Sequence, residues 1–296
     1  MTVNMFSPAH ARSLCEARAM GVPAVAAGQD LAAFLYTRWY AAPRADVRLD
    51  PAWPPLEGML RLAQQEALGW QAATAVGQGA GGVVVARGAG GRARALLRGG
   101  YTHVAGSGRT GLPVQPGEDV VAVPRSGGVT SEGWWRSWGC GWDPRTAPEG
   151  TTRVYLSPAV WELPSLVGAL TVALEEHAEP WMVKVAAHAE SLGRPDAVVV
   201  YLASTAAFGA IGECATGRVQ DHAGPPLTGP LSPGVAWAQD PGDGRSFGES
   251  RCSLVAAAML RSLDGDDQSF LRAAAEEFTA AGLDPAAPHM GRPANA

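Results

Sequence analysis

The chain has 296 residues, of which 47% are hydrophobic and 17% charged, a composition typical of a globular protein with a buried core. Its 23 basic and 28 acidic residues leave a net charge of −5, which argues against general binding to nucleic acids or anionic membranes. No apolar run approaches the roughly 18 residues of a membrane span. The N-terminus shows no secretion signal and the four cysteines are widely spaced, so we expect a cytoplasmic protein without a disulfide framework or metal cage.

The first half of the chain shows only scattered regular patterns. Residues 1–20 are weakly patterned, a helix is expected from Asp30 until Pro43 closes it, and a second helix covers 56–70. Residues 77–104 alternate short apolar runs with glycine and predict small strands and a hairpin. Residues 105–150 are rich in Gly, Pro and Ser, so we expect a domain boundary near residue 150.

The second half is patterned more regularly. We expect strands over 151–157, 181–187, 196–202 and 235–239, and helices over 161–177, 204–214, 246–263 and 266–282. Strands mixed with helices, without a strict βαβ rhythm, predict an α+β fold: a mixed C-terminal sheet flanked by helices, preceded by a smaller helix-plus-hairpin region. The predicted domains are 1–150, for peptide or partner binding, and 151–296.

Lys184 is the only lysine among the 23 basic residues. It lies in the middle of a predicted strand between apolar neighbours, where an amine is rarely buried without a role. Burial can bring an ammonium towards its neutral form, whereas a guanidinium stays charged, so Lys184 is a candidate base or Schiff-base residue. The alternative is that Lys184 points to solvent from a half-exposed strand.

Three arginines in the same half form a candidate phosphate site. Arg194 precedes a predicted central strand, while Arg245 and Arg251 flank the start of a helix that follows the turn-rich segment DPGDG. Backbone N–H groups at a helix start, together with guanidinium forks, are typical of phosphate binding. The alternative is a turn with solvated arginines, and we interpret the aspartates of the segment as turn residues rather than metal ligands.

A tryptophan cluster interleaved with arginine precedes the predicted boundary: Trp134, Trp135, Trp138 and Trp142. It forms either an exposed recognition surface or, as we favour, a packed core under long loops.

Several segments of the second half resemble one protein family. RVYLSP, WMVKVAAHAESLGRPDAVVVYL, LSPGVAWAQDPGDGRSFGESRC and FLRAAAEEFTAAGLDPAAPHMG together cover about residues 151–290. They are similar to the HopA-type effector family, which occurs in type III effectors and in bacterial peptide-modification clusters. The resemblance implies a phosphothreonine-lyase-like fold, distantly related to the OspF-type lyases, and a lyase activity as in class V lanthipeptide and thioamitide biosynthesis.

This resemblance implies roles for individual residues. Lys184 falls at the position of the base, Arg194 at that of the following arginine, and Arg251, with Arg245, at the late arginine pair. The OspF-type enzymes have lysine-x-histidine where this chain has Arg153-Val154-Tyr155, so Tyr155 would be the general acid.

The implied reaction eliminates phosphate from phosphoserine or phosphothreonine in a ribosomally made precursor peptide and leaves a dehydroamino acid. No cofactor or metal is required, and the implied partners are the phosphopeptide and a kinase-like phosphotransferase. Tyr201 is a candidate to orient the phosphate, while His177, His188 and His222 are rival acids. Arg153 is expected to face away from Tyr155, because side chains alternate along a strand.

Three other functions stay open from the sequence. A catalytically silent module could bind phosphopeptides as a scaffold for the kinase. A host-directed effector would carry a secretion signal or a disordered N-terminus, and a Schiff-base enzyme would use Lys184.

Overall fold

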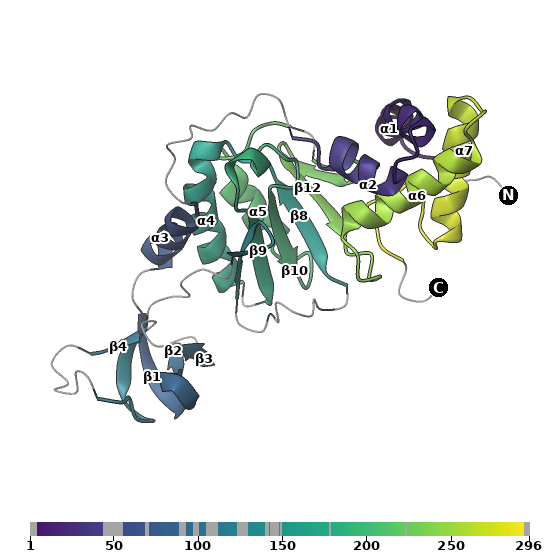
Figure 1. Ribbon diagram of the computed structural model, residues 1–296. Coiled ribbons are helices and arrows are strands. Elements are labelled where there is room, and N and C mark those ends of the chain that lie inside the picture. Colours follow the sequence, from purple (N-terminus) through teal and green to yellow (C-terminus); the bar gives the residue numbers. More distant parts are fainter. Residues whose placement is uncertain are drawn as a thin grey trace.

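The computed structural model describes residues 5–43, 56–68, 71–88, 93–96, 101–104, 112–122, 130–139, 142, 148, 150–177, 179–222 and 224–292. The described chain forms a main body, in which helices cover both faces of a large sheet, and a small separate sheet (Figure 1). The predicted α+β class is confirmed.

The large sheet has seven strands in the order β11-β12-β8-β10-β9-β7-β6. They are β6 (Thr130–Ser131), β7 (Trp134–Trp138), β8 (Thr152–Leu156), β9 (Trp181–Ala186), β10 (Val198–Leu202), β11 (Gly229–Ser232) and β12 (Val235–Gln239). All described pairings are antiparallel, so the expectation of a mixed sheet is wrong. The reason is that β8 and β9, which run in the same direction, are separated by β10, which is antiparallel to both.

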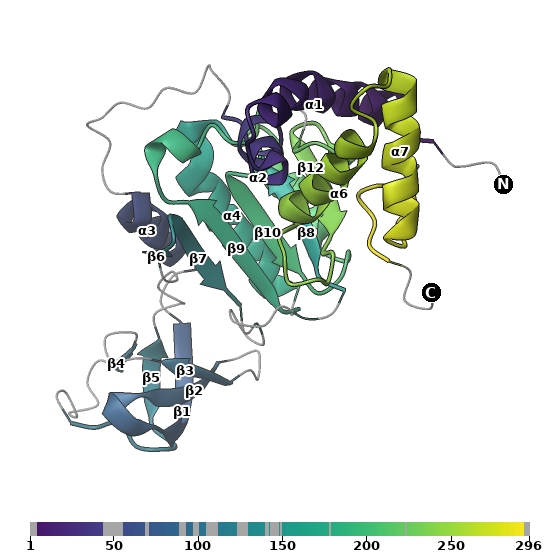
Figure 2. The same cartoon turned by 45° about the vertical axis from the view of Figure 1, so that its right-hand side comes forward.

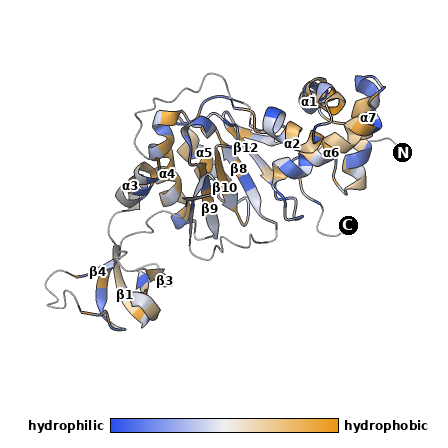
Figure 3. Cartoon of the chain, in the orientation of Figure 1, coloured by the Kyte–Doolittle hydropathy of each residue, from blue (hydrophilic) through white to orange (hydrophobic). Residues whose placement is uncertain are grey.

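Helices on the two faces of the sheet enclose two separate cores. One face packs against α3 (Leu56–Leu68), α4 (Leu163–Glu176) and α5 (Phe208–Ala215). The other packs against α2 (Leu31–Leu35) and α6 (Phe247–Arg261), and α1 (Pro8–Ala26) and α7 (Asp267–Ala280) pack on the outside of these two helices (Figure 2). In Figure 3 the outer helices carry both hydrophilic and hydrophobic stretches, as expected for amphipathic helices on a sheet.

Local sequence explains where most of the helices begin. Ser246 caps α6 and forms a capping box with Glu249, Asp266 caps α7, and a proline stands in the first turn of α4. Helix α1 lies partly in a region for which we predicted little structure. It buries only Leu14 and three small residues, so its apolar stripe is too narrow to give a strong periodic signal.

The packing does not divide at residue 150. Strand β7 pairs with β9, and α1 and α2 share a hydrophobic core with α6 and α7, so segments before residue 150 complete the body formed by the later ones. A short π-helix, η1 (Tyr36–Tyr40), continues α2.

The small sheet has the order β3-β2-β1-β5-β4 and a small core of its own around Val84 and Val120. Its strands are β1 (Gln71–Gln78), β2 (Val84–Gly88), β3 (Ala93–Leu96), β4 (Tyr101–His103) and β5 (Asp119–Ala122). Within the described chain, no helix is long and apolar enough to cross a membrane.

Candidate active site

The candidate site lies on the sheet face that packs against α2, η1 and α6. Arg136 of β7, Lys184 of β9, Val199 of β10 and Tyr155 of β8 are successive cross-strand partners, so their side chains form one row on this face. Adjacent strands are about 4.8 Å apart. Arg136 is therefore the immediate neighbour of Lys184, whereas Tyr155 is two strands away.

A tight turn places Arg136 in this row. Strands β6 and β7 are joined by Glu132 and Gly133, which have φ angles of 52° and 75°. Positive φ at both central residues is characteristic of the type I′ hairpin turn. The guanidinium of Arg136 lies 3.4 Å from the carboxylate of Glu132, which is 83% exposed, so this ion pair holds it only weakly.

Lys184 is partly buried among cations. Burial is the main cause that lowers the pKa of Lys184 from 10.5 to about 8. The positive charges of Arg136, Arg153 and Arg194 act in the same direction, while Asp196 opposes them. Among the described residues no carboxylate forms an ion pair with the amine, so no ion pair there offsets these causes, and the amine is half neutral near pH 8.

The indole of Trp134 brings Lys184 and Arg194 together. The Nζ atom of Lys184 lies 4.1 Å from the centre of a Trp134 ring, and Cζ of Arg194 lies 5.3 Å from it. Arg194 makes a two-point ion pair with Asp196, with both N–O distances 2.8 Å, and its Nη2 donates to the Tyr36 hydroxyl at 3.3 Å. Its Nη1 has no hydrogen-bond partner in the described part of the chain.

Arg153 belongs to the same face, so the expectation that it points away from Tyr155 is wrong. Side chains alternate along a strand, which puts residues two positions apart on one side of the sheet. The guanidinium of Arg153 is ion-paired with Asp240, and its Cζ lies 5.2 Å from the ring centre of Tyr201. Its charge also reaches Lys184, and it therefore adds to the positive potential of the site.

The tyrosines predicted for the site lie deeper than the cations. Tyr155 is 3% exposed, and its hydroxyl lies close enough to that of Tyr40 from η1 to influence the pKa of both groups. Tyr201 is 9% exposed and packs between Arg153 and Trp142. Burial raises the pKa of both hydroxyls, so both are protonated at neutral pH.

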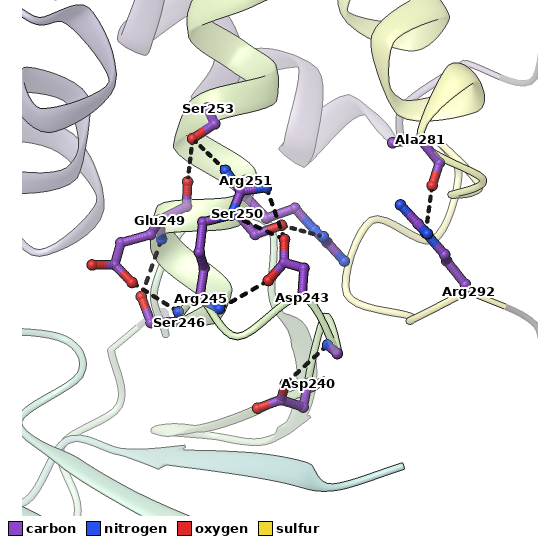
Figure 4. Close-up of polar contacts among 11 residues, drawn as sticks. Asp240, Asp243, Arg245, Ser246, Glu249, Ser250, Arg251, Ser253, Ala281 and Arg292 are labelled. Atoms are coloured by element: carbon purple, nitrogen blue, oxygen red, sulfur yellow. Dashed lines mark hydrogen bonds and ion pairs between the residues drawn. The ribbon is translucent and has the colours of Figure 1, made fainter. Parts of the chain in front are cut away.

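Arg251 and Arg245 do not join the cluster around Lys184. Arg251 is 1% exposed and donates from Nε to the carbonyl of Pro288 and from Nη2 to that of Met290, both at 2.9 Å. Arg245 is exposed and forms an ion pair with Asp243 in the loop before α6 (Figure 4). Arg251 holds the C-terminal segment in place, and Arg245 stabilises a turn. The guanidinium of neither residue is directed at Lys184.

The described histidines, tryptophans and cysteines singled out in the sequence lie outside the cluster around Lys184, except for Trp134. His177 and His188 are exposed, and His222 is partly buried in a loop. Trp135 and Trp142 are buried, so the tryptophan cluster is largely packed, as favoured from the sequence. Cys15, Cys214 and Cys252 are free, and Cys140 lies outside the described residues. The described chain contains no group of His, Cys, Asp or Glu suited to hold a metal.

Sequence reasoning missed three members of the cluster: Arg136, Tyr36 and Asp196. Tyr36 stands 158 residues before its partner Arg194, and local sequence gives no indication of this contact. Arg136 had a usable signal, since the pattern WWRSW alternates as a strand does, in addition to forming an aromatic cluster.

The sequence of the second half, which forms most of this sheet, matches a known class of protein. The profile of the HopA1 effector protein family matches residues 139–290, just over half of the chain. The chain therefore belongs to the HopA1 effector protein family.

Two solved structures share its fold. An effector protein from Pseudomonas syringae pv. tomato strain DC3000 is 17% identical, with a TM-score of 0.56 over 96% of this chain and 99% of that one. An effector protein from Pseudomonas syringae pv. syringae strain 61 is 14% identical, with a TM-score of 0.57 over 98% and 100%. No curated protein matches the chain.

Proposed function

We propose that the protein is a carbon–oxygen lyase that eliminates phosphate from phosphoserine or phosphothreonine in a ribosomally made peptide. The observation that carries this proposal is the position of a low-pKa amine beside two guanidinium groups: Lys184 next to Arg136 and Arg194. Such a site can bind a dianion and can also present an uncharged base beside it.

The reaction needs a base of this kind. The proton on the α-carbon of a phosphorylated residue is weakly acidic, so it must be removed by a neutral, well-positioned amine. Lys184 supplies that amine. As the proton is removed, the Cα–Cβ double bond forms and the Cβ–O bond breaks. Phosphate leaves, and a dehydroalanine or dehydrobutyrine residue remains in the peptide.

The proposed phosphate-binding site, called the phosphate seat below, consists of Arg194, Arg136 and Arg153 and differs from the site expected from the sequence. Arg194 is retained, because Asp196 and Trp134 fix its guanidinium while Nη1 stays available. Arg136 and Arg153 replace Arg251 and Arg245, which are engaged elsewhere. Positive groups that bind the phosphate also stabilise the charge that develops as the C–O bond breaks.

The N-terminal region has two roles in this proposal. Helices α1 and α2 complete the lyase body. The small sheet of residues 71–122 is left to hold the peptide or a kinase-like phosphotransferase, which would supply the phosphorylated substrate. Neither role calls for a metal or an organic cofactor.

A synthetic phosphopeptide tests the activity directly. We expect the protein to remove the mass of one phosphoric acid from a phosphoserine or phosphothreonine peptide, as followed by mass spectrometry. Lys184→Met should lower this rate by roughly 10²–10⁴-fold or more, since one catalytic base typically contributes that much. Phosphopeptide binding should persist in Lys184→Met.

The control for that substitution is Arg272→Met, which removes an exposed cation from α7, away from the site and from the small sheet. Unchanged elimination by Lys184→Met would rule out the base. Binding by the wild-type protein without any product would instead identify a silent phosphopeptide-binding module.

A further inference from the structure

We propose that Tyr36, on the π-helical turn η1, donates the proton to the leaving phosphate oxygen; this assignment rests on the lyase activity proposed above. Tyr155, the donor implied by the sequence, is nearly fully buried and two strands away from Lys184. The reaction therefore needs a hydroxyl nearer to the amine and to the open side of the cluster.

The π-helical turn gives its two tyrosines different partners. Ala41 N–H bonds the carbonyl of Tyr36 at 2.9 Å, the five-residue spacing of a π-helix. The rings of Tyr36 and Tyr40 are stacked, 5.7 Å apart with planes at 17°. The hydroxyl of Tyr40 nevertheless lies in the core near Tyr155, whereas that of Tyr36 accepts a hydrogen bond from Arg194.

The contacts of Arg194 place the Tyr36 hydroxyl at the proposed phosphate seat. Arg194 is fixed by Asp196, and its Nη2 lies 3.3 Å from the Tyr36 oxygen. The same guanidinium and the amine of Lys184 both lie over Trp134. A phosphate bound by Arg194 would thus be next to the tyrosine hydroxyl and near the amine. Tyr36 is only partly buried, unlike Tyr40 at 2% exposure.

The hydroxyl is in the right protonation state. Burial and the carboxylate of Asp196 raise the pKa of Tyr36 above its usual value of 10, although Arg194 acts in the opposite direction. Tyr36 therefore holds its proton at neutral pH. A hydroxyl that accepts a hydrogen bond from a guanidinium also keeps its own O–H free to donate.

Each proton and electron pair of the complete step has a defined destination. The amine of Lys184 takes the α-proton, the C–H electron pair becomes the Cα–Cβ double bond, and the Cβ–O bond breaks with its pair going to oxygen. Tyr36 gives its proton to that oxygen, so the product is hydrogen phosphate instead of the trianion that would otherwise leave. The ammonium of Lys184 and the phenolate of Tyr36 then return to their starting states by proton exchange with water.

Tyr36→Phe tests this role, because it removes only the hydroxyl and keeps the ring that stacks on Tyr40. We expect elimination from a phosphoserine peptide to fall by roughly 10²–10⁴-fold. Melting temperature and phosphopeptide affinity should stay close to those of the wild type. Tyr40→Phe and Tyr155→Phe are the matched controls and should each keep activity within a few-fold.

A peptide carrying S-phosphocysteine separates proton donation from a structural effect. Its sulfur leaves more readily without a proton than oxygen does, so the defect of Tyr36→Phe should shrink on this substrate. An equal defect on both substrates, or wild-type activity in Tyr36→Phe, overturns the assignment. If the wild-type protein eliminates phosphate from neither peptide, the proposed lyase function fails instead.

Discussion

Arg136 lies directly opposite Lys184 in the antiparallel pair formed by β7 and β9, with no carboxylate of the described chain paired to the amine. Two cations at adjacent cross-strand positions repel each other, and this repulsion is one reason why the pKa of Lys184 is lowered to about 8. The elimination rate should therefore depend on pH through the amine.

The first prediction concerns this pH dependence. The base acts when neutral, so kcat/KM should rise with pH, bend near pH 8 and level off above it. Arg136→Met removes one cause of the lowered pKa and should move the bend to higher pH, while Arg272→Met on α7 should leave it in place. The measurement is of initial rates above pH 7, where the phosphate is already a dianion. A bend that stays fixed in Arg136→Met would contradict the role of Arg136.

The second prediction is that Lys184→Met makes the protein more stable at neutral pH. The pKa of Lys184 is about 8 in the folded protein, against 10.5 for an unperturbed lysine, so holding the charged form costs folding free energy. That cost is fully present below pH 8 and disappears as pH rises to about 10.5. The difference between these two pKa values corresponds to roughly 3 kcal/mol at most, so we expect a gain of about 1–3 kcal/mol, or roughly 2–10 °C in melting temperature. Equal melting temperatures of Lys184→Met and the wild type at pH 7 would show that the charged amine does not destabilise the folded protein.

Much of the C-terminal half could be predicted from its sequence. The expected strand at 235–239 coincides with β12, and the expected helices at 246–263 and 266–282 differ from α6 and α7 by one or two residues at each end. The two helices begin at clear N-caps, Ser246 and Asp266, and such signals are local. Lys184 was identified for the same reason, since an apolar strand around a single lysine can be seen in the sequence alone.

The composition of the site was harder to predict because it depends on which strands become neighbours. The pairing of Arg136 with Lys184 depends on the register of β7 against β9, and Tyr36 reaches Arg194 from the opposite end of the chain. Arg251 shows the reverse case. Its position beside a helix start suggests a phosphate ligand. In the structure its hydrogen bonds go to the backbone carbonyls of Pro288 and Met290, near the end of the chain.

The third prediction separates Arg251 from Arg245. Arg251→Met fills a similar volume but leaves the buried carbonyl of Pro288 and the partly buried carbonyl of Met290 without donors, so unfolding free energy should fall by about 2–4 kcal/mol. Arg245→Met breaks only an exposed ion pair with Asp243 and should change stability by less than about 1 kcal/mol. Chemical denaturation measures both, and limited proteolysis should cut Arg251→Met near its C-terminus. A large loss of phosphopeptide affinity in Arg245→Met, with stability intact, would show that Arg245 binds the phosphate.

The fourth prediction concerns Asp240, which neutralises Arg153 at the border of the site. Both side chains of this ion pair are largely buried, at 11% and 18% exposure, so Asp240→Asn leaves a guanidinium without its counter-ion. The expected loss of stability is about 3 kcal/mol. The same change raises the positive potential at Lys184, so a phosphopeptide should raise the melting temperature of Asp240→Asn by more than that of the wild type.

Arg153→Met provides the counterpart to that experiment. It also breaks the ion pair and should destabilise the protein, but it removes the positive charge, so phosphopeptide should stabilise it less than the wild type. Thermal unfolding with and without phosphopeptide compares the three proteins directly. Because both variants lose the same ion pair, opposite responses to the ligand identify Arg153 as part of the phosphate seat. Equal responses would show that the pair only joins β8 to the end of β12.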